Sequence, residues 1–254
     1  MKLLASTTDR FGGIIVDSST LPENPDGFAE QLQHSFDIWR EQGSKLVWIE
    51  VPLAKSNLIP IAVEAGSIFH HSTHDHLMLA HRLVSDAYVP SYATHYIGAG
   101  GVVINERQEL LVVSELHRRD KSRPYYKLPG GALNQKEHLA DAVMREVYEE
   151  TGVETKFEAV VCFRHWHNYR FGKSDIYFIC RLSPLSDAIT RQDNEIDECL
   201  WMPVDEYLNS EYVGEFNRRI VELALNHKGL KSGWFEGYDD PTLREFFVPA
   251  DKTT

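Results

Sequence analysis

Cysteine is scarce in this chain of 254 residues, which contains only three. They stand at positions 162, 180 and 199, without the paired spacing of a structural zinc site, and their odd number does not suit a disulfide framework. The first residues, MKLLASTTDRFGG, have a short apolar stretch but lack the core of a secretory signal. We therefore expect reduced cysteines in a cytoplasmic protein.

The chain also lacks long apolar runs and an excess of positive charge, and both absences limit its expected partners. No apolar run approaches the roughly 20 residues that a membrane-spanning helix needs, so no membrane partner is expected. Positive charge is in deficit, because 26 Lys and Arg stand against 38 Asp and Glu, and the formal net charge is −12. This balance argues against nucleic acid as a partner. An acidic protein that handles an anionic small molecule needs cations between the two, and divalent metal ions supply them.

What the chain does have is a dense pattern in residues 131–153, GALNQKEHLADAVMREVYEETGV. It fits G-x5-E-x7-R-E-U-x-E-E-x-G-U, in which U is aliphatic, at every fixed position. Apolar residues recur at intervals of three and four from Leu139 to Thr151, which predicts a helix that ends at Gly152. Three carboxylates share one face of this helix: Glu146, Glu149 and Glu150.

Carboxylates at this spacing repel one another, and a bound cation relieves the repulsion. Oxygen ligands without nearby His or Cys favour Mg²⁺ or Mn²⁺. We interpret Arg145 and Glu137 as orienting groups, because a guanidinium holds carboxylates through paired hydrogen bonds. Gly130 and Gly131 come directly after Pro129, in a segment predicted to turn sharply before the helix. Without side chains there, the backbone can approach a metal or a phosphate closely. The pattern predicts these metal-binding residues: Glu146, Glu149, Glu150 and Gly131.

This pattern resembles the signature of the Nudix hydrolase family. The resemblance implies an α/β/α sandwich with a mixed sheet, and a pyrophosphatase that uses Mg²⁺ or Mn²⁺ on a small nucleotide substrate. Members of the family remove the proton of the attacking water with a glutamate from the helix or from a later loop. Carried onto this chain, the resemblance gives four catalytic candidates: Arg145, Glu146, Glu149 and Glu195. For Glu195, a base, an additional metal ligand and an ordinary loop acid remain alternatives.

The α/β chain is expected to form two domains and a tail. Residues 1–93 form a smaller α+β N-terminal domain, with an amphipathic helix from Phe28 to Gln42, and they resemble a domain found in animal and plant members of one Nudix branch. Residues 94–225 form the hydrolase domain, and its stretches 97–105 and 109–116 are interpreted as a hairpin. Residues 226–254 form a tail to which we assign no contacts.

The N-terminal domain also holds a group of histidines: His70, His71, His74 and His76. Alternation along a strand is expected to place His74 and His76 on one face. Their spacing, without a paired cysteine, does not match a structural zinc site. We therefore favour a polar edge over a metal site.

Four residues are candidates for substrate binding: Tyr126, Arg164, Gly130 and Gly131. Tyr126 precedes KLPGG, where a base or ribose would stack, and Arg164 belongs to a basic segment before a loop. Trp166 and Tyr169 are further aromatic candidates. Core packing, or solvation of a loop, explains each of these side chains equally well.

The branch resemblance implies ADP-ribose or NADH as the substrate. The alternatives are a dinucleoside polyphosphate or nucleoside triphosphate hydrolase, and a nucleotide-sensing or protein-interaction module with little turnover. A homodimer is a further expectation, because family members often dimerise. One departure is visible: some members that cleave ADP-ribose carry a proline about fifteen residues beyond the pattern, where this chain has Asn168.

Overall fold

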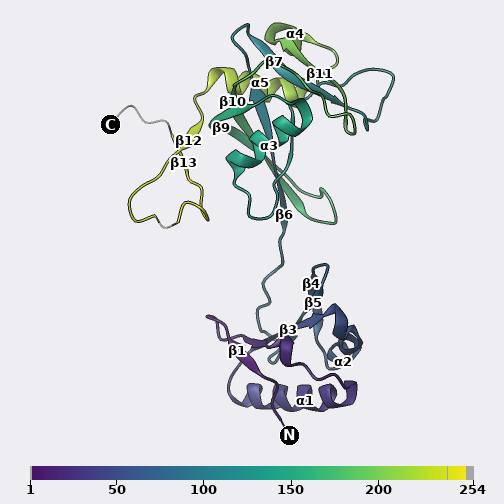
Figure 1. Cartoon of the computed structure of the whole chain (residues 1–254). Helices are drawn as coiled ribbons and strands as arrows, with labels where there is room; N and C mark the ends of the chain where they lie inside the picture. The colour runs from purple at the N-terminus through teal and green to yellow at the C-terminus, as the bar shows by residue number, and fades with distance from the viewer. Residues whose placement is uncertain (1, 239, 250–254) are drawn as a thin grey trace. The chain divides into compact units, whose positions relative to one another are not determined.

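The computed structural model describes residues 2–238 and 240–249. Contacts within the chain divide it into two compact units, Met1–Ala93 and Thr94–Thr254 (Figure 1). Among the described residues, no helix is both long and apolar enough to cross a membrane, and the three cysteines are free.

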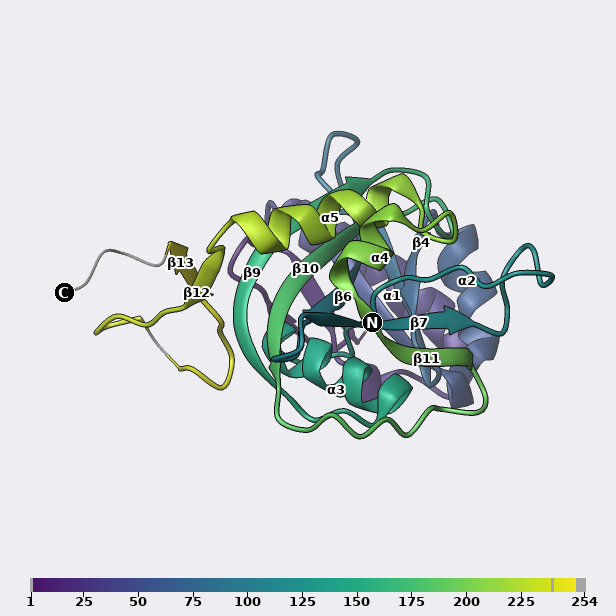
Figure 2. The same ribbon diagram turned by 90° about the horizontal axis from the view of Figure 1, so that it is seen from above.

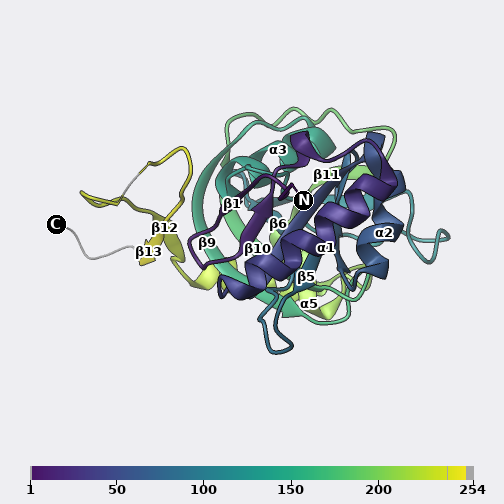
Figure 3. The same cartoon turned by 90° about the horizontal axis from the view of Figure 1, so that it is seen from below.

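The first unit is a five-stranded sheet covered by a long helix. Its strand order is β1-β2-β3-β5-β4, in which β2 and β3 are parallel and the other neighbours antiparallel. The strands are β1 Ser6–Thr8, β2 Ile14–Val16, β3 Leu46–Pro52, β4 Ile68–Ser72 and β5 His76–Arg82, and the helices are η1 Ser18–Thr20, α1 Pro25–Glu41, η2 Leu53–Leu58 and α2 Ile59–Glu64. Figure 3 shows α1 lying across the sheet. The expected smaller α+β domain is confirmed.

Helix α1 forms where the sequence predicts it. The side chain of Asn24 accepts a hydrogen bond from the backbone of Asp26, and Pro25 begins the helix, so both ordinary start signals are present. The side chains at helical spacing that face the sheet are buried: Phe28, Leu32, Phe36 and Trp39. Full burial of each stabilises the unit by about 1.5–3 kcal/mol.

The histidines of this unit lie differently from the expectation. His74 lies in the turn between β4 and β5, outside both strands, so alternation does not place it on a face with His76. His71 stacks on Tyr92 with ring centroids 4.2 Å apart. Within the described parts of the chain, no three His, Cys, Asp or Glu side chains form a group that could hold a metal ion.

The second unit has a six-stranded mixed sheet and a separate two-stranded sheet. The larger sheet has the order β13-β12-β9-β10-β6-β8, with β6 and β10 parallel, and the smaller pairs β11 with β7. The strands are β6 His95–Val103, β7 Glu109–Glu115, β8 Gly130–Ala132, β9 Thr155–Trp166, β10 Ser174–Pro184, β11 Ile196–Pro203, β12 Leu230–Ser232 and β13 Phe247–Pro249. The helices are α3 Leu139–Thr151, α4 Val204–Asn209 and α5 Glu215–Asn226.

Two helices cover opposite faces of the larger sheet. Helix α3 packs its apolar side against one set of β6 and β10 side chains, and α5 packs against the other set. Figure 2 shows α3 and α5 flanking β9, β10 and β6. Alternation along β6 explains the division, because Val102 joins the α5 side while Val103 joins the α3 side. The predicted α/β/α sandwich with a mixed sheet is confirmed.

The predicted hairpin of 97–105 and 109–116 is wrong. Strands β6 and β7 form there, but the two stretches meet only next to the turn, through an isolated bridge between Ile104 and Leu110 and a hydrogen bond from the Asn105 N–H to the Glu109 carbonyl oxygen at 3.0 Å. Beyond it β6 enters the larger sheet between β10 and β8, while β7 pairs with β11. Both partners come from later in the sequence, so local pattern alone does not reveal the separation.

Candidate active site

Helix α3 carries the acidic pattern beside its core contacts, with Glu146 and Glu150 turned toward β8. Leu139, Val143 and Val147 are buried against β6 and β10. Gly152 ends the helix at φ 71°, a left-handed conformation that suits glycine, and its N–H donates to the carbonyl oxygen of Tyr148 at 2.7 Å. The glutamates therefore project from a helix that is anchored by its apolar side and ended by a glycine cap.

The three glutamates of this helix have different surroundings. Glu150 is only 6% exposed, and one of its oxygens accepts a hydrogen bond from the Gly130 N–H at 2.9 Å. Burial raises the pKa of Glu150 to about 7, although the positive charge of Lys127 opposes the shift. Burial also raises the pKa of Glu146, against a hydrogen bond from Arg145. The Glu149 side chain is about half exposed.

Arg145 joins the carboxylates of this site. Its Nε donates to Glu137 at 2.6 Å, and its Nη1 donates to Glu146 at 2.9 Å and to Glu149 at 3.0 Å. A further bond reaches the Ala132 carbonyl oxygen at 3.2 Å, which ties helix α3 to strand β8. The guanidinium thus makes the orienting contacts that the sequence suggested for it.

Gly130 and Gly131 do not form a loop but the short edge strand β8, paired with β6. Gly130 has φ 150°, and a Cβ there would lie 2.2 Å from the Ala99 carbonyl oxygen. A Cβ on Gly131 would lie 2.4 Å from Oε2 of Glu146. The missing side chains therefore allow this strand to lie directly against β6 and the carboxylates.

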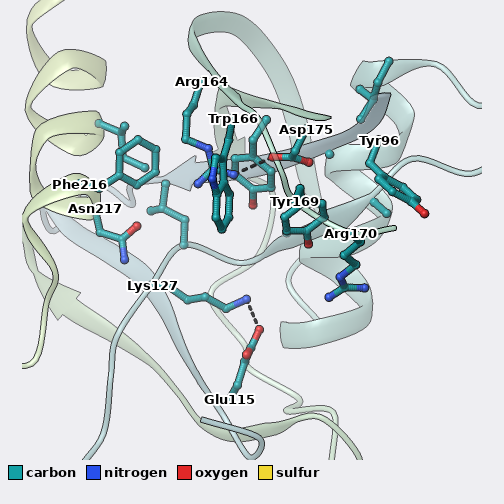
Figure 4. Close-up of a pocket in the computed structure, with 18 of the residues that line it drawn as sticks. Tyr96, Glu115, Lys127, Arg164, Trp166, Tyr169, Arg170, Asp175, Phe216 and Asn217 are labelled. Carbon is teal, nitrogen blue, oxygen red and sulfur yellow. Dashed lines mark hydrogen bonds and ion pairs between the residues drawn. The ribbon is translucent and has the colours of Figure 1, made fainter. Parts of the chain in front are cut away.

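A cleft of about 510 Å³ opens beside β8 (Figure 4). Its wall combines aromatic rings with cations: Tyr96, Tyr125, Trp166, Tyr169, Tyr177 and Phe216, together with Lys127, Arg164 and Arg170. Both glycines of β8, Gly130 and Gly131, line it as well. A cavity of this size with a few convergent polar groups is typical of a small-molecule site.

Arg164 is fixed within this wall. Its Nη2 donates to Asp175 at 2.7 Å, and the Asp175 side chain is 7% exposed. The guanidinium also lies 5.1 Å from the ring centroid of Trp166 and 5.3 Å from that of Phe216. Trp166 packs against Tyr169, with their centroids 5.2 Å apart. The structure thus brings Arg164, Trp166 and Tyr169 together in the cleft.

Two of the candidates lie elsewhere. Tyr126 does not line the cleft: it is 9% exposed, belongs to the core on the α5 side, and its hydroxyl donates to Glu198 at 2.7 Å. In the extended segment before β8, neighbouring side chains alternate, so Tyr125 and Lys127 face the cleft instead. Glu195 is exposed in the turn before β11 and does not line the cleft either.

Sequence reasoning missed an ion pair at the cleft. Lys127 Nζ donates to Glu115 Oε1, and both residues line the cavity, as Figure 4 shows. Glu115 ends strand β7, and Lys127 stands directly before LPGG. Alternation along YYKLPGG is the signal that would have selected Tyr125 and Lys127 over Tyr126.

A family model described as a NUDIX domain matches residues 94–224, and one described as a Nudix hydrolase domain matches residues 4–83. The chain belongs to the Nudix hydrolase family. It is a hydrolase with the extra N-terminal domain, and the suspected resemblance is confirmed.

Relatives of this Nudix hydrolase occur in plants and animals. Nudix hydrolase 2 of Arabidopsis thaliana is 40% identical over 239 residues, covering 93% of this chain and 84% of that protein. Nudix hydrolase 8 of the same plant is 39% identical over 233 residues, covering 89% of this chain but only 63% of that longer protein. The human protein named nucleoside diphosphate-linked moiety X motif 6 is 34% identical over 255 residues, covering 97% of this chain and 78% of that protein.

The acidic face of this Nudix hydrolase suits the divalent cation that the family generally uses. All its charged donors are carboxylates, the ligands preferred by hard cations. Burial raises the pKa of Glu146 and Glu150, as expected for carboxylates whose charge lacks full compensation. In the described structure Arg145 engages Glu146 and Glu149, and no three-ligand group is assembled. The carboxylates of Glu146, Glu149 and Glu150 are thus a donor set that suits a hard divalent cation.

Proposed function

We propose that this Nudix hydrolase is a Mg²⁺- or Mn²⁺-dependent pyrophosphatase that cleaves a nucleoside diphosphate linked to another group, with ADP-ribose or NADH as the first candidates. The observation that carries the proposal is the cleft beside β8, where aromatic rings and cations share the lining with Gly130 and Gly131. These two glycines in turn lie against Glu150 and Glu146 of the acidic helix. Aromatic faces suit a nucleobase, and Arg164 and Arg170 suit phosphate oxygens. A nucleotide diphosphate supplies both groups in one molecule.

The protein residues divide the work as follows in this proposal. Glu146, Glu149 and Glu150 hold the cation, which supplies charge neutralisation at the diphosphate and an acidified water. Arg145 keeps the carboxylates oriented through its three ion pairs. Close backbone at Gly131 gives the substrate access to them.

Two glutamates are candidates for removing the proton of the attacking water. Neither side chain lines the cleft: Glu149 is about half exposed on the acidic helix, and Glu195 lies in the turn before β11. Glu149 is favoured, because Arg145 joins it to Glu146 beside the proposed cation, where a base comes within hydrogen-bond reach of the water. Glu149→Gln should lower kcat much more than Glu195→Gln. A large effect at position 195 would move the role there.

A product screen tests the reaction itself. The full chain is incubated with Mg²⁺ and, separately, with Mn²⁺, and products are identified by mass spectrometry. ADP-ribose should yield AMP and ribose 5-phosphate, and NADH should yield AMP and reduced nicotinamide mononucleotide. Diadenosine polyphosphates, coenzyme A and nucleoside triphosphates complete the panel. Binding without cleavage by folded protein would overturn the proposal in favour of a nucleotide sensor.

A basic loop supports dinucleoside polyphosphates as the second candidate. Residues 117–123, HRRDKSR, carry four Lys or Arg and one Asp in a protein of net charge −12. The loop borders a hollow of about 910 Å³ that shares Glu115 and Tyr125 with the cleft. Arg118 is tied inward to Asp197 at 2.7 Å, whereas Arg119 and Lys121 form no ion pair with any other described residue. Phosphates beyond a diphosphate would meet this charge.

The loop is tested by removing its two outward charges together. Arg119→Gln with Lys121→Gln should raise KM severalfold for a diadenosine polyphosphate and little for ADP-ribose. Lys156→Gln with Lys231→Gln removes the same charge from β9 and β12, away from the cleft. Equal effects of the two double variants would leave the loop no special role.

We also retain the homodimer as a proposal, measured by sedimentation of the full chain.

A further inference from the structure

The acidic helix α3 begins without a cap from its own neighbourhood. Its N-cap residue is His138, whose side chain makes no capping hydrogen bond. The first backbone N–H groups of any helix lack partners within the helix, and Ser, Thr, Asp or Asn usually supplies one. Here the missing acceptor comes from a residue more than a hundred positions later in the chain.

That residue is Glu245. Its Oε2 accepts a hydrogen bond from the Leu139 N–H at 2.5 Å, and its Oε1 accepts one from the Ala140 N–H at 3.1 Å. His138 is drawn into the same contact, with Nδ1 3.7 Å from Oε2 of Glu245 and Nε2 3.1 Å from the Pro241 carbonyl oxygen. A carboxylate at this end of a helix is also favoured by the helix dipole.

The C-terminal segment is seated by independent contacts. Strands β12 and β13 pair with each other, and Leu230 of β12 pairs with Val160 of β9, so the segment extends the larger sheet. Figure 1 shows this β12–β13 hairpin beside β9. The rings of Phe247 and Phe157 lie 5.6 Å apart. Glu245, two residues before β13, is thereby held against the start of α3.

We propose that Glu245 is a positioning residue for the acidic helix. A helix is stiff and rises 1.5 Å per residue, so an anchor at residues 139 and 140 sets where Glu146 and Glu150 stand roughly 10–15 Å along its axis. The Arg145–Glu137 pair anchors the same helix from the β8 side. Seating of the C-terminal segment is thereby coupled to the geometry of the carboxylates. The consequence for catalysis rests on the proposed function, whereas the capping itself does not.

The test begins with Glu245→Ala in the full, metal-free chain. Hydrogen exchange of the amides in the first turns of α3 should accelerate about three- to tenfold, since loss of a cap typically changes a helix-end equilibrium by this factor. Glu245→Gln is measured as well, and Glu236→Gln is its matched control, because Glu236 is exposed in the same segment and loses its charge by the same change. Amide exchange in Glu236→Gln should equal that of wild type. Exchange in Glu245→Gln should be faster than in wild type and slower than in Glu245→Ala.

Catalysis is the second readout. With the substrate found in the product screen, Glu245→Ala should lower kcat about three- to tenfold while KM changes less than twofold, because the cleft wall on β9 and β10 is untouched. If no substrate is cleaved, the exchange measurement still decides whether Glu245 caps α3. The two failures are therefore distinguishable.

A rescue variant separates capping from simple attachment of the segment. His138 already has the extended backbone of an N-cap, at φ −73° and ψ 149°. Adding His138→Asp to Glu245→Ala supplies a local cap and should restore both the slow exchange and kcat. Unchanged exchange and kcat in Glu245→Ala would overturn the proposal. Failure of the rescue, with the double variant still folded, would also overturn it, because the role would then be attachment of the segment.

Discussion

His81 in the first unit and Glu150 in the second are both buried ionisable side chains that burial shifts toward the neutral form. His81 is 7% exposed and stacks on Phe36 with ring centroids 3.7 Å apart, and burial lowers its pKa to about 4. Glu150 is 6% exposed, and burial raises its pKa to about 7. Through these two groups, acidification opposes folding at His81 and favours it at Glu150.

The surroundings of His81 and Glu150 show that the two buried side chains have different roles. His81 packs in an aromatic core, and its Nδ1 has no hydrogen-bond partner among the described residues. Glu150 accepts the Gly130 N–H and lies in the field of Lys127, beside the cleft. His81 thus acts as a packing group that happens to titrate. The charge of Glu150 is costly unless a cation stabilises it, which is the arrangement of a functional site.

The largest expected effect is on turnover in Glu150→Gln. Glutamine keeps an oxygen for the Gly130 N–H and loses the charge, so kcat should fall about 100- to 1,000-fold, or about 3–4 kcal/mol in barrier, while the fold persists. Steady-state kinetics at saturating Mg²⁺ measure this. Glu154→Gln, just beyond the helix, is the control and should match wild type. Normal turnover in Glu150→Gln would remove this residue from the metal site.

The same variant fixes the sign of the pH dependence. The pKa of Glu150 is about 7 in the folded state and about 4.5 ordinarily, so its stabilising contribution is complete below pH 4.5 and is lost as pH rises through 7. The metal-free wild type should lose stability over this window relative to Glu150→Gln. Urea unfolding at several pH values checks this difference.

The next largest effect is acid destabilisation of the first unit through His81. Its folded pKa of about 4 lies below the ordinary 6.5, so stability is complete above pH 6.5 and is lost as pH falls toward 4. At about 1.4 kcal/mol per unit of pKa, the total is about 3 kcal/mol. Hydrogen exchange in α1, corrected for intrinsic rates, reports this unit alone. His81→Phe should abolish the loss, whereas the exposed control His74→Gln should leave it in place.

A smaller effect is expected at Asp175, a buried carboxylate that differs from Glu150 in having an ion-pair partner. Arg164→Gln would leave this carboxylate without its guanidinium and should destabilise the second unit by about 2 kcal/mol, since the arginine is about one-third exposed. It should also raise KM by weakening phosphate binding in the cleft. Thermal unfolding and kinetics measure the two parts. Unchanged stability would mean that water replaces the arginine at Asp175.

The sequence predicts what is encoded locally and misses what distant segments decide. Helices α1 and α3 follow from apolar periodicity and start or stop residues within their own span. The separation of β6 from β7 depends on pairing with the distant strands β10 and β11, and the Glu245 cap on Leu139 comes from still farther along the chain. No local pattern carries those pairings. The helix that carries the glutamates was therefore predictable, whereas the cleft wall was predictable only as a set of candidates.

Tyr125 and Tyr126 provide the finest test, because they are neighbours that face opposite surroundings. Tyr126→Phe deletes the hydroxyl that donates to Glu198 at 2.7 Å in the core, and it should cost about 1 kcal/mol of stability without changing KM. Tyr125→Phe should change stability by less than about 0.5 kcal/mol, because that side chain is half exposed in the cleft.

Truncation separates the two tyrosines on the binding side. Tyr125→Ala removes an aromatic face from the cleft and should raise KM about fivefold, within the range of one stacking contact. The KM of Tyr125→Ala is compared with that of Tyr126→Phe, because truncating Tyr126 to alanine would leave a cavity in the core. A KM effect in Tyr126→Phe, with none in Tyr125→Ala, would return the substrate contact to Tyr126. A KM effect in Tyr125→Ala, with none in Tyr126→Phe, would place the Tyr125 ring against the substrate in the cleft. Both residues are tyrosines, so it is alternation along the extended segment that decides which ring the substrate meets.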